Sequence, residues 1–111
     1  IIDDVNYPGG INNRQKTGAN YDIIAPNDLT IAKPAGEWNK GVLKIQDNKV
    51  EHWLNSKKVV EYTYGSDQWN EDVGNSKFAK WEYANAHDKG HLSLQGHGDK
   101  VSFRKIRIKE L

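Results

Sequence analysis

Hydrophobic and polar residues alternate most regularly between Trp38 and Tyr64. Three runs in this stretch, WNKGVLKIQ, KVEHWLN and KVVEYTY, have the period of two that is typical of half-buried strands. The dipeptide Asp47-Asn48 and the residues near Ser56 separate the runs, and both places are rich in turn-forming residues. The pattern therefore predicts an antiparallel meander.

The middle run of this meander has a clear division between its two faces. Alternation places Val50, His52 and Leu54 on one face and Glu51 and Trp53 on the other. Because His52 lies between two aliphatic residues, we expect it to face the core with its ring hydrogen-bonded.

The C-terminal stretch at residues 90–111, GHLSLQGHGDKVSFRKIRIKEL, has the second clear strand pattern. In an extended strand Leu92 and Leu94 fall on one face, whereas Gln95 and His97 fall on the other. Glycines and an aspartate then predict a turn, and the alternation resumes in VSFRKIRI after a change of phase. We expect a closing hairpin that buries its leucines and turns its polar face toward a ligand.

The stretch at residues 66–81 breaks the period of two and has helix-capping signals instead. Ser66 or Asp67 suits the N-cap of one short helix, and Ser76 suits that of a second. We expect this helical excursion to cover an open end or edge of the sheets.

Two shorter stretches complete the predicted strands. Residues 1–5 have the pattern of the end of a strand, and residues 17–26 have that of a short strand. With the meander and the closing hairpin they make six or seven strands, which are spaced too closely for βαβ units. We therefore predict an all-β, antiparallel sandwich that forms a single domain over residues 1–111 or the C-terminal portion of one.

Composition narrows the possible partners. A formal net charge of +1 gives no field that would attract nucleic acid, and no apolar run approaches the length of a membrane span, so we expect neither partner. The absence of cysteine excludes disulfides and every metal site built on thiolates. The chain begins without methionine, within strand-like residues, so we expect a processed or truncated product.

The aromatic residues and histidines suit sugar recognition. Four tryptophans and five tyrosines offer faces that pack on the C–H surface of a pyranose, although core packing is the commoner role of a tryptophan. His97 is the best candidate for a general base, because a neutral imidazole accepts a proton near neutral pH. The alternative for His97 is a turn histidine that contacts solvent or a backbone carbonyl.

The sequence is compatible with two further kinds of catalysis, one assisted by a metal ion and one that uses a pair of carboxylates. His91, His97, Asp3 and Asp99 could converge on a divalent metal, but their spacing matches no metal motif, so neither the metal nor the need for one follows. A pair of glycosidase carboxylates is also open among the acidic residues Asp3, Asp4, Asp22, Glu37 and Asp99.

Six segments, IIDD, TGANYD, GEWN, VEHWLN, SKF and GHLSLQGHGDKVSFRKIRI, occur in an order that resembles the 3-keto-disaccharide hydrolase domain family. The resemblance covers the whole chain and implies a concanavalin-like jelly-roll sandwich, of which this chain is the C-terminal part. An isolated half would leave apolar faces and strand edges exposed, unless a further fragment of the protein supplies the missing strands, so we expect that a second chain or a homodimer could complete the sandwich.

The resemblance implies cleavage of glycosides that carry a ketone at C3 of the sugar. In such chemistry a base removes the acidified C2 proton and the aglycone leaves from C1. His97 is the implied base or metal ligand and Tyr21 the implied proton donor. The implied sugar-binding residues are Gln95, Asp3, Trp38 and Arg104. The family also implies a periplasmic or secreted location in a bacterium.

The chain departs from the family pattern at three positions, where the family usually has aspartate, glycine and asparagine in place of Gly96, Ser56 and Lys105. The departure at Gly96 adjoins His97 and could remove a ligand or a hydrogen-bond acceptor, so it bears on catalysis more than on the fold. Two other interpretations therefore compete with the interpretation of this chain as part of an enzyme. They are a non-catalytic lectin-like carbohydrate-binding module and an interaction domain of a larger protein.

Overall fold

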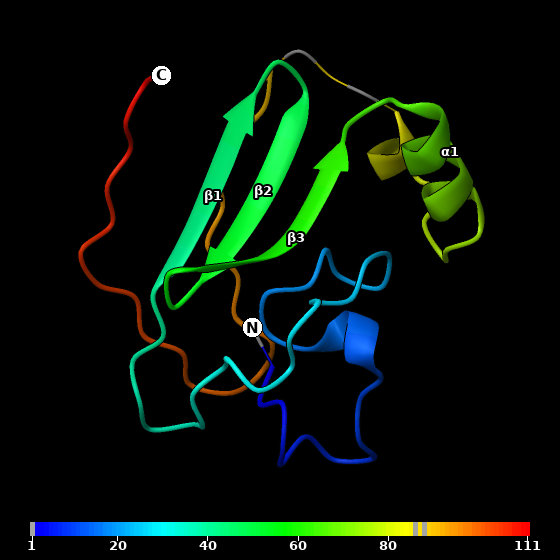
Figure 1. Ribbon diagram of the computed structural model, residues 1–111. Coiled ribbons are helices and arrows are strands. Elements are labelled where there is room, and N and C mark those ends of the chain that lie inside the picture. The colour runs from blue at the N-terminus through cyan, green and yellow to red at the C-terminus, as the bar shows by residue number, and fades with distance from the viewer. Residues whose placement is uncertain (1, 86, 88) are drawn as a thin grey trace.

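The computed structural model describes residues 2–85, 87 and 89–111. Its centre is an antiparallel sheet of β1 (Gly41–Gln46), β2 (Lys49–Leu54) and β3 (Lys57–Thr63), in the order β1-β2-β3 (Figure 1). The predicted meander is therefore confirmed: β1 and β2 lie inside their predicted runs, and β3 begins one residue before its run.

Both turns of the meander place two consecutive residues in the left-handed region. The φ angles are 50° and 62° at Asp47 and Asn48, and 49° and 73° at Asn55 and Ser56. Two-residue turns of this kind match the twist of the flanking strands. Ser56 therefore occupies a backbone conformation that favours glycine, the residue that the family pattern has at this position.

The inner face of β2 is buried as its alternation predicts. Val50 and Leu54 are almost fully buried, and His52 between them is partly buried. The Nδ1 atom of His52 lies 3.0 Å from the carbonyl oxygen of Gly18. A carbonyl only accepts, so Nδ1 carries the proton and donates it, which confirms the prediction of a core-facing, hydrogen-bonded histidine.

The helix α1 (Asp67–Gly74) closes one end of this core. It begins at Ser66, whose Oγ accepts a hydrogen bond of 3.2 Å from the Trp69 N–H. Trp69 is 1% exposed and stacks on Tyr62 of β3, with ring centroids 4.8 Å apart. The first predicted helix is therefore confirmed, and its position is fixed by an aromatic stack on the sheet.

The second predicted helix is wrong. Residues 76–81 form turns, followed by a single 3-10 turn, η2 (Glu82–Ala84). The hydroxyl of Ser76 does accept a hydrogen bond from the Phe78 N–H, but the same hydroxyl donates to the carbonyl of Val73 at the end of α1. This second bond ties the segment back to α1, so the capping signal is real and starts a turn only.

The two N-terminal strand predictions are also wrong. Residues 2–5 lead into a turn, and residues 17–26 form a compact loop with one isolated bridge, Asn20 to Ile24. Asp22 has a φ of 61°, which a continuous strand does not allow. A short 3-10 helix, η1 (Asn13–Gln15), lies between these stretches.

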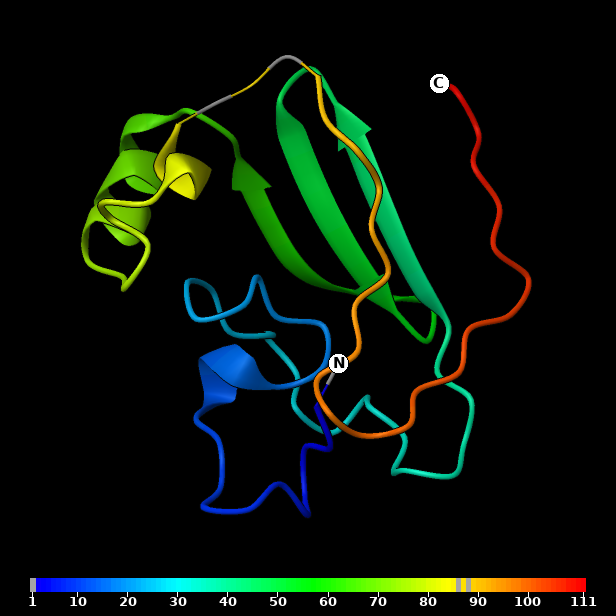
Figure 2. The same cartoon turned by 180° about the vertical axis from the view of Figure 1, so that it is seen from behind.

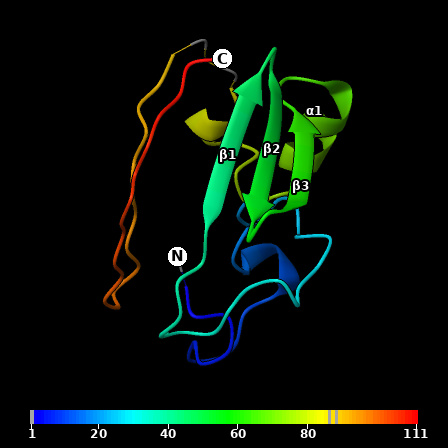
Figure 3. The ribbon, with the colours of Figure 1, turned by 60° about the vertical axis from the view of Figure 1, so that its left-hand side comes forward.

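The C-terminal hairpin differs most from its prediction. Residues 90–111 run alongside the sheet as a separate extended layer, and no strand is assigned within them (Figures 1–3). Leu92 and Leu94 are 62% and 52% exposed and not buried as expected. A strand forms its ladder with neighbouring strands, and among the described residues β1, β2 and β3 pair only with one another.

Within the described residues the fold is thus mostly sheet, antiparallel, with one short α-helix. It has three of the six or seven predicted strands in that part of the chain, and it remains consistent with a jelly-roll sandwich. No helix among these residues has the length and apolarity to cross a membrane.

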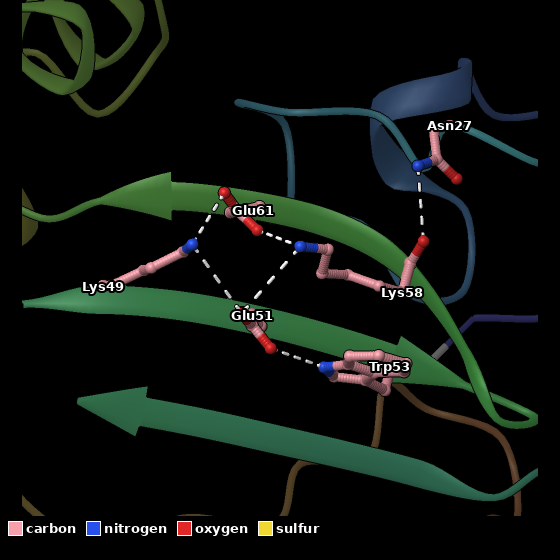
Figure 4. A network of polar contacts seen from close by, with 6 residues as sticks. All are labelled: Asn27, Lys49, Glu51, Trp53, Lys58 and Glu61. Atoms are coloured by element: carbon pink, nitrogen blue, oxygen red, sulfur yellow. Dashed lines mark hydrogen bonds and ion pairs between the residues drawn. The ribbon is translucent and has the colours of Figure 1, made fainter.

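The outer face of the sheet is polar (Figure 4). Glu51 and Glu61 are directly opposite each other on neighbouring strands, and two lysines offset their repulsion. Lys49 lies 3.1 Å from Glu61, and Lys58 bridges both glutamates. Glu51 also accepts a hydrogen bond of 2.8 Å from the Trp53 indole. The charges of this outer face are thus paired with one another.

Gly18→Ala should destabilise the protein more than Gly36→Ala. Both glycines have positive φ, but only at Gly18 would a Cβ meet neighbours, 3.1 Å from Val59 and 3.4 Å from Leu54. We expect a loss of about 2–4 kcal/mol for Gly18→Ala and about 1–2 kcal/mol for Gly36→Ala. Urea unfolding followed by tryptophan fluorescence measures both, and equal losses would show that the close approach of Gly18 to β3 is not a constraint.

Candidate functional site

His97 is an exposed side chain in contact with an aromatic ring from the N-terminal loop. Its imidazole meets the ring of Tyr7 edge to face, with centroids 6.0 Å apart and planes at 66°. Tyr7 is partly buried, and its carbonyl accepts a hydrogen bond from the Gly10 N–H that closes the loop. The loop thus sets a phenol ring against the candidate base.

Arg104 forms the second contact of the C-terminal segment. The centre of its guanidinium lies 3.9 Å from the centroid of the Trp38 ring, within the range of a cation–π contact. Trp38 is 45% exposed, so part of its ring is open to a ligand. The contact holds the exposed Arg104 guanidinium over the indole ring, with N–H donors that a ligand can reach.

These two contacts explain the path of the C-terminal segment. Figure 2 shows the orange part running along the sheet before it turns beside the loop that precedes β1. Ring contacts at Tyr7 and Trp38 therefore hold the segment where a strand ladder does not. They set His97 against Tyr7 and Arg104 against Trp38, and Gln95 lies exposed in the same segment.

Asp3 is engaged within its own turn. Its carboxylate accepts hydrogen bonds from the backbone N–H groups of Val5 and Asn6, at 2.9 Å and 3.0 Å, and from the Asn6 side chain. The Asn6 backbone bond, followed by that of Val5, holds the pKa of this carboxyl below its ordinary value. Asp3 is thus an ionised acceptor that orders the loop carrying Tyr7.

Tyr21 lies in a different place from the contact of His97 with Tyr7. With Asn20, Phe78 and Trp81 it lines a hollow of about 220 Å³ beside η2. Among the described residues, Tyr7 and not Tyr21 supplies the phenol ring that touches His97. The sequence missed Tyr7, although an aromatic residue inside the turn sequence NYPGG is a signal that it contacts something other than the local backbone.

Lys77 is a second residue that the sequence did not reveal. Its Nζ lies 2.8 Å from the Asp22 carboxylate, 4.7 Å from the centroid of the Tyr21 ring and 5.2 Å from that of Phe78. The hydrogen bond between Lys77 and Asp22 lowers the pKa of Asp22 and raises the pKa of Lys77. Both groups are therefore charged at neutral pH.

No metal centre forms in the described part of the chain. The residues 2–85, 87 and 89–111 contain no group of three or more histidines, aspartates or glutamates placed to hold a metal ion. The convergence of His91, His97, Asp3 and Asp99 that the sequence leaves open is not found among them.

The antiparallel sheet and its surrounding loops are consistent with a jelly-roll fold. The chain belongs to the 3-keto-alpha-glucoside-1,2-lyase-like domain family, whose sequence model matches residues 1–109.

Two comparisons agree with this assignment. The chain is 37% identical, over 125 aligned residues, to a 3-keto-disaccharide hydrolase of Bacteroides thetaiotaomicron. The alignment covers all of this chain and 42% of that relative. The crystal structure of a protein from Parabacteroides distasonis, described as a "putative glycosyl hydrolase", superposes with a TM-score of 0.65 at 37% identity. That match covers 75% of this chain and 40% of the other, so the chain spans less than half the length of either relative.

Asp22→Asn should destabilise the protein by about 0.5–1 kcal/mol at pH 7, because it removes the ion pair with Lys77. The lowered pKa of Asp22 means that its contribution is complete above the ordinary aspartate pKa of about 3.9 and is lost as the pH falls through the folded-state pKa. Asparagine tolerates the positive φ of Asp22, so the change isolates the charge.

The measurement is the free energy of unfolding of both proteins from pH 7 down to about pH 2, where the difference should shrink. The exposed Asp99, changed to Asn, is the control and should cost little at any pH. A difference for Asp22→Asn that grows on acidification would contradict the sign derived from the ion pair.

Proposed function

We propose that the protein containing this chain cleaves 3-keto-glycosides, with His97 as the general base. The observation that supports the proposal most is the placement of the segment at residues 95–104. Its imidazole and its guanidinium are both exposed, and each is held against an aromatic ring. A base, a hydrogen-bond donor and an apolar platform are the three groups that this chemistry requires.

The reaction is an elimination followed by addition of water. The ketone at C3 acidifies the C2 proton, and the base takes that proton while the electron pair forms an enolate on C2, C3 and the ketone oxygen. The enolate then re-forms the C3 carbonyl, C1 and C2 become doubly bonded, and the C1–O bond breaks. The aglycone leaves with its bonding pair and is protonated, and water adds to C1 in a later step.

The side chains take the following roles in this proposal. Neutral His97 accepts the C2 proton, and Arg104 donates hydrogen bonds to the oxygen that becomes negative. The open part of the Trp38 ring packs against the sugar, and Gln95 hydrogen-bonds its hydroxyls. Asp3 acts through the loop that it orders, in place of the direct sugar contact expected for it.

Proton return to the aglycone is the step with two candidate donors. Tyr21 is the donor that the family resemblance implies, but its ring lines the hollow beside η2. Tyr7 is in ring contact with His97, so we assign the step to Tyr7 in the arrangement of the described residues.

The second candidate function is a non-catalytic sugar-binding module, and Gly96 is the residue that favours it. The family's usual aspartate would stand next to the base, and this chain has no side chain there. Gly96 does not have a positive φ, and a Cβ would lie 3.5 Å from Val101, so an aspartate would fit. Its loss is thus a change of chemistry and not a requirement of the backbone.

We also propose that the protein works in the bacterial periplasm or outside the cell, as the family resemblance implies.

We further propose that additional strands cover the exposed apolar residues of the sheet. Every residue of β1 is exposed, including Leu43 at 52% and Ile45 at 58%. The outer edge of β1 pairs with no strand among the described residues. An apolar strand with an open edge is a site for pairing with another strand, here from a second chain or a second copy.

His97→Ala should lower kcat on a 3-keto-glycoside by about 10²–10⁴-fold while sugar binding is retained, because a general base contributes that much. The matched control is His87→Ala, another exposed histidine, which should leave kcat unchanged. Turnover is followed by release of the aglycone, and binding by calorimetry. If the wild-type protein shows no turnover with or without added divalent metal, the lectin-like interpretation replaces the enzyme. Full turnover by His97→Ala would remove His97 from the mechanism.

The isolated chain of 111 residues should form dimers or larger species through β1 and the exposed leucines. Light scattering after size exclusion measures the mass. Leu43→Lys combined with Ile45→Lys should shift the mass toward a monomer, because lysine on an edge strand opposes pairing. Lys44→Glu, which changes a residue between them on the opposite face, is the control. A monomer at every concentration would contradict the proposal.

A further inference from the structure

Two asparagine side chains fasten the loop that carries Trp38 to the end of β2. The loop at residues 31–40 consists of turns and irregular backbone, and it contains the GEWN segment. Asn39, the last residue of that segment, and Asn55, the last residue of VEHWLN, are both half-buried. Their side chains meet directly, since Nδ2 of Asn55 donates a hydrogen bond of 2.8 Å to Oδ1 of Asn39. One pair of amides therefore joins two segments from different parts of the chain.

The Asn55 amide also bonds to two backbone groups of the loop. Its Oδ1 accepts a hydrogen bond of 2.9 Å from the Lys40 N–H, beside a backbone bond of 2.8 Å from the Asn55 N–H to the Lys40 carbonyl. These two bonds continue the pairing of β1 with β2 one step beyond Gly41 and Leu54. Nδ2 donates its other hydrogen bond to the Ile31 carbonyl at 2.8 Å. Both N–H donors of the amide are therefore in use.

Asparagine is the residue type that suits position 55 best. The φ of 49° at Asn55 is left-handed, which favours glycine, asparagine and aspartate. Glycine has no side chain, and an ionised aspartate has no side-chain donor. Asparagine combines the backbone conformation with one acceptor and two donors. The loop contacts, and not the turn alone, thus determine the residue at this position.

Asn39 closes the loop on itself. Its Oδ1 accepts a hydrogen bond of 2.8 Å from the Lys33 N–H, and its Nδ2 donates one of 3.0 Å to the Lys33 carbonyl. Trp38 is the neighbour of Asn39, so it lies at the base of this closed loop. The Trp38 ring is also the ring that lies 3.9 Å from the centre of the Arg104 guanidinium. The place of Arg104 is thereby linked to the pair of amides through one ring contact.

We propose that Asn39 and Asn55 are positioning residues for the Trp38 ring. Through this ring they also place the Arg104 guanidinium, because a cation–π contact holds a cation only where the ring itself is held. The inference rests on the proposed function for the role of Arg104 in turnover. The placement of Arg104 is observable separately from turnover.

The test compares Asn55→Gly with Asn48→Gly in the intact protein. Both positions have a left-handed φ that glycine accepts, but Asn55→Gly removes the hydrogen bonds to Lys40, Ile31 and Asn39, whereas the exposed Asn48 lies in the other turn of the meander. The measurement is the NMR spectrum of the arginine Nε–H groups. The Arg104 signal is identified as the one that is missing from Arg104→Lys.

The face of the Trp38 ring shields the Arg104 protons, so Trp38→Leu should move the Arg104 signal downfield. Asn55→Gly should move it downfield by a large part of that change, and Asn48→Gly should leave it in place. The value of kcat/KM on a 3-keto-glycoside should fall about tenfold in Asn55→Gly, less than the roughly 10²–10³-fold loss that follows removal of a whole oxyanion donor.

An Arg104 signal that keeps its wild-type position in folded Asn55→Gly overturns the positioning proposal, whatever the turnover. An equal displacement in Asn48→Gly also overturns it, because any change in the meander would then have the same effect. If Asn55→Gly does not fold, Asn39→Ala gives the same reading, and an unmoved signal there overturns the proposal too. A wild-type protein without turnover, in which Asn55→Gly still displaces the Arg104 signal, contradicts the catalytic proposal and supports the positioning.

Discussion

The close approach of the Gly18 turn to the inner face of the sheet is the contact on which the rest of the chain depends. The Gly18 carbonyl accepts a hydrogen bond from the His52 imidazole, and a Cβ at Gly18 would press on Val59. This contact fixes the loop at residues 17–26 against β2 and β3. The loop in turn places Ile23 in the core with Trp69 and sets Tyr21 and Asp22 at the surface beside Lys77.

The parts of the fold that the sequence predicts are those whose partners are close along the chain. The meander has turns of two residues and an alternating inner face, and α1 has its cap three residues before Trp69, so local rules decide both. The loop at residues 17–26 has an apolar alternation that reads as a strand, but its conformation is set by Gly18 and the left-handed Asp22, which periodicity does not detect. The prediction of a C-terminal hairpin is wrong for a related reason. A strand pattern leads to a hydrogen-bonded ladder only where neighbouring strands exist.

The candidate site divides in the same way. His97, Trp38 and Arg104 can each be recognised as candidate site residues from the sequence. The residue type alone shows that an imidazole can act as a base, an indole can pack on a sugar and a guanidinium can donate hydrogen bonds. Their pairing is not, because the contact of His97 with Tyr7 and that of Arg104 with Trp38 each join distant parts of the chain. The contacts of Lys77 are harder still to predict from the sequence, because tertiary packing brings Asp22 and the rings of Tyr21 and Phe78 to it.

The C-terminal layer connects assembly to chemistry. Among the described residues it is positioned by two ring contacts, and its leucines and isoleucines are exposed on a segment with strand-like alternation. A ring contact fixes one point of a backbone, whereas a ladder fixes every second residue and with it the face to which each side chain points. Strands that covered those apolar residues would therefore order His97 and Gln95 together with the sheet. On this view the surfaces that complete the sandwich also determine how rigidly the base is held.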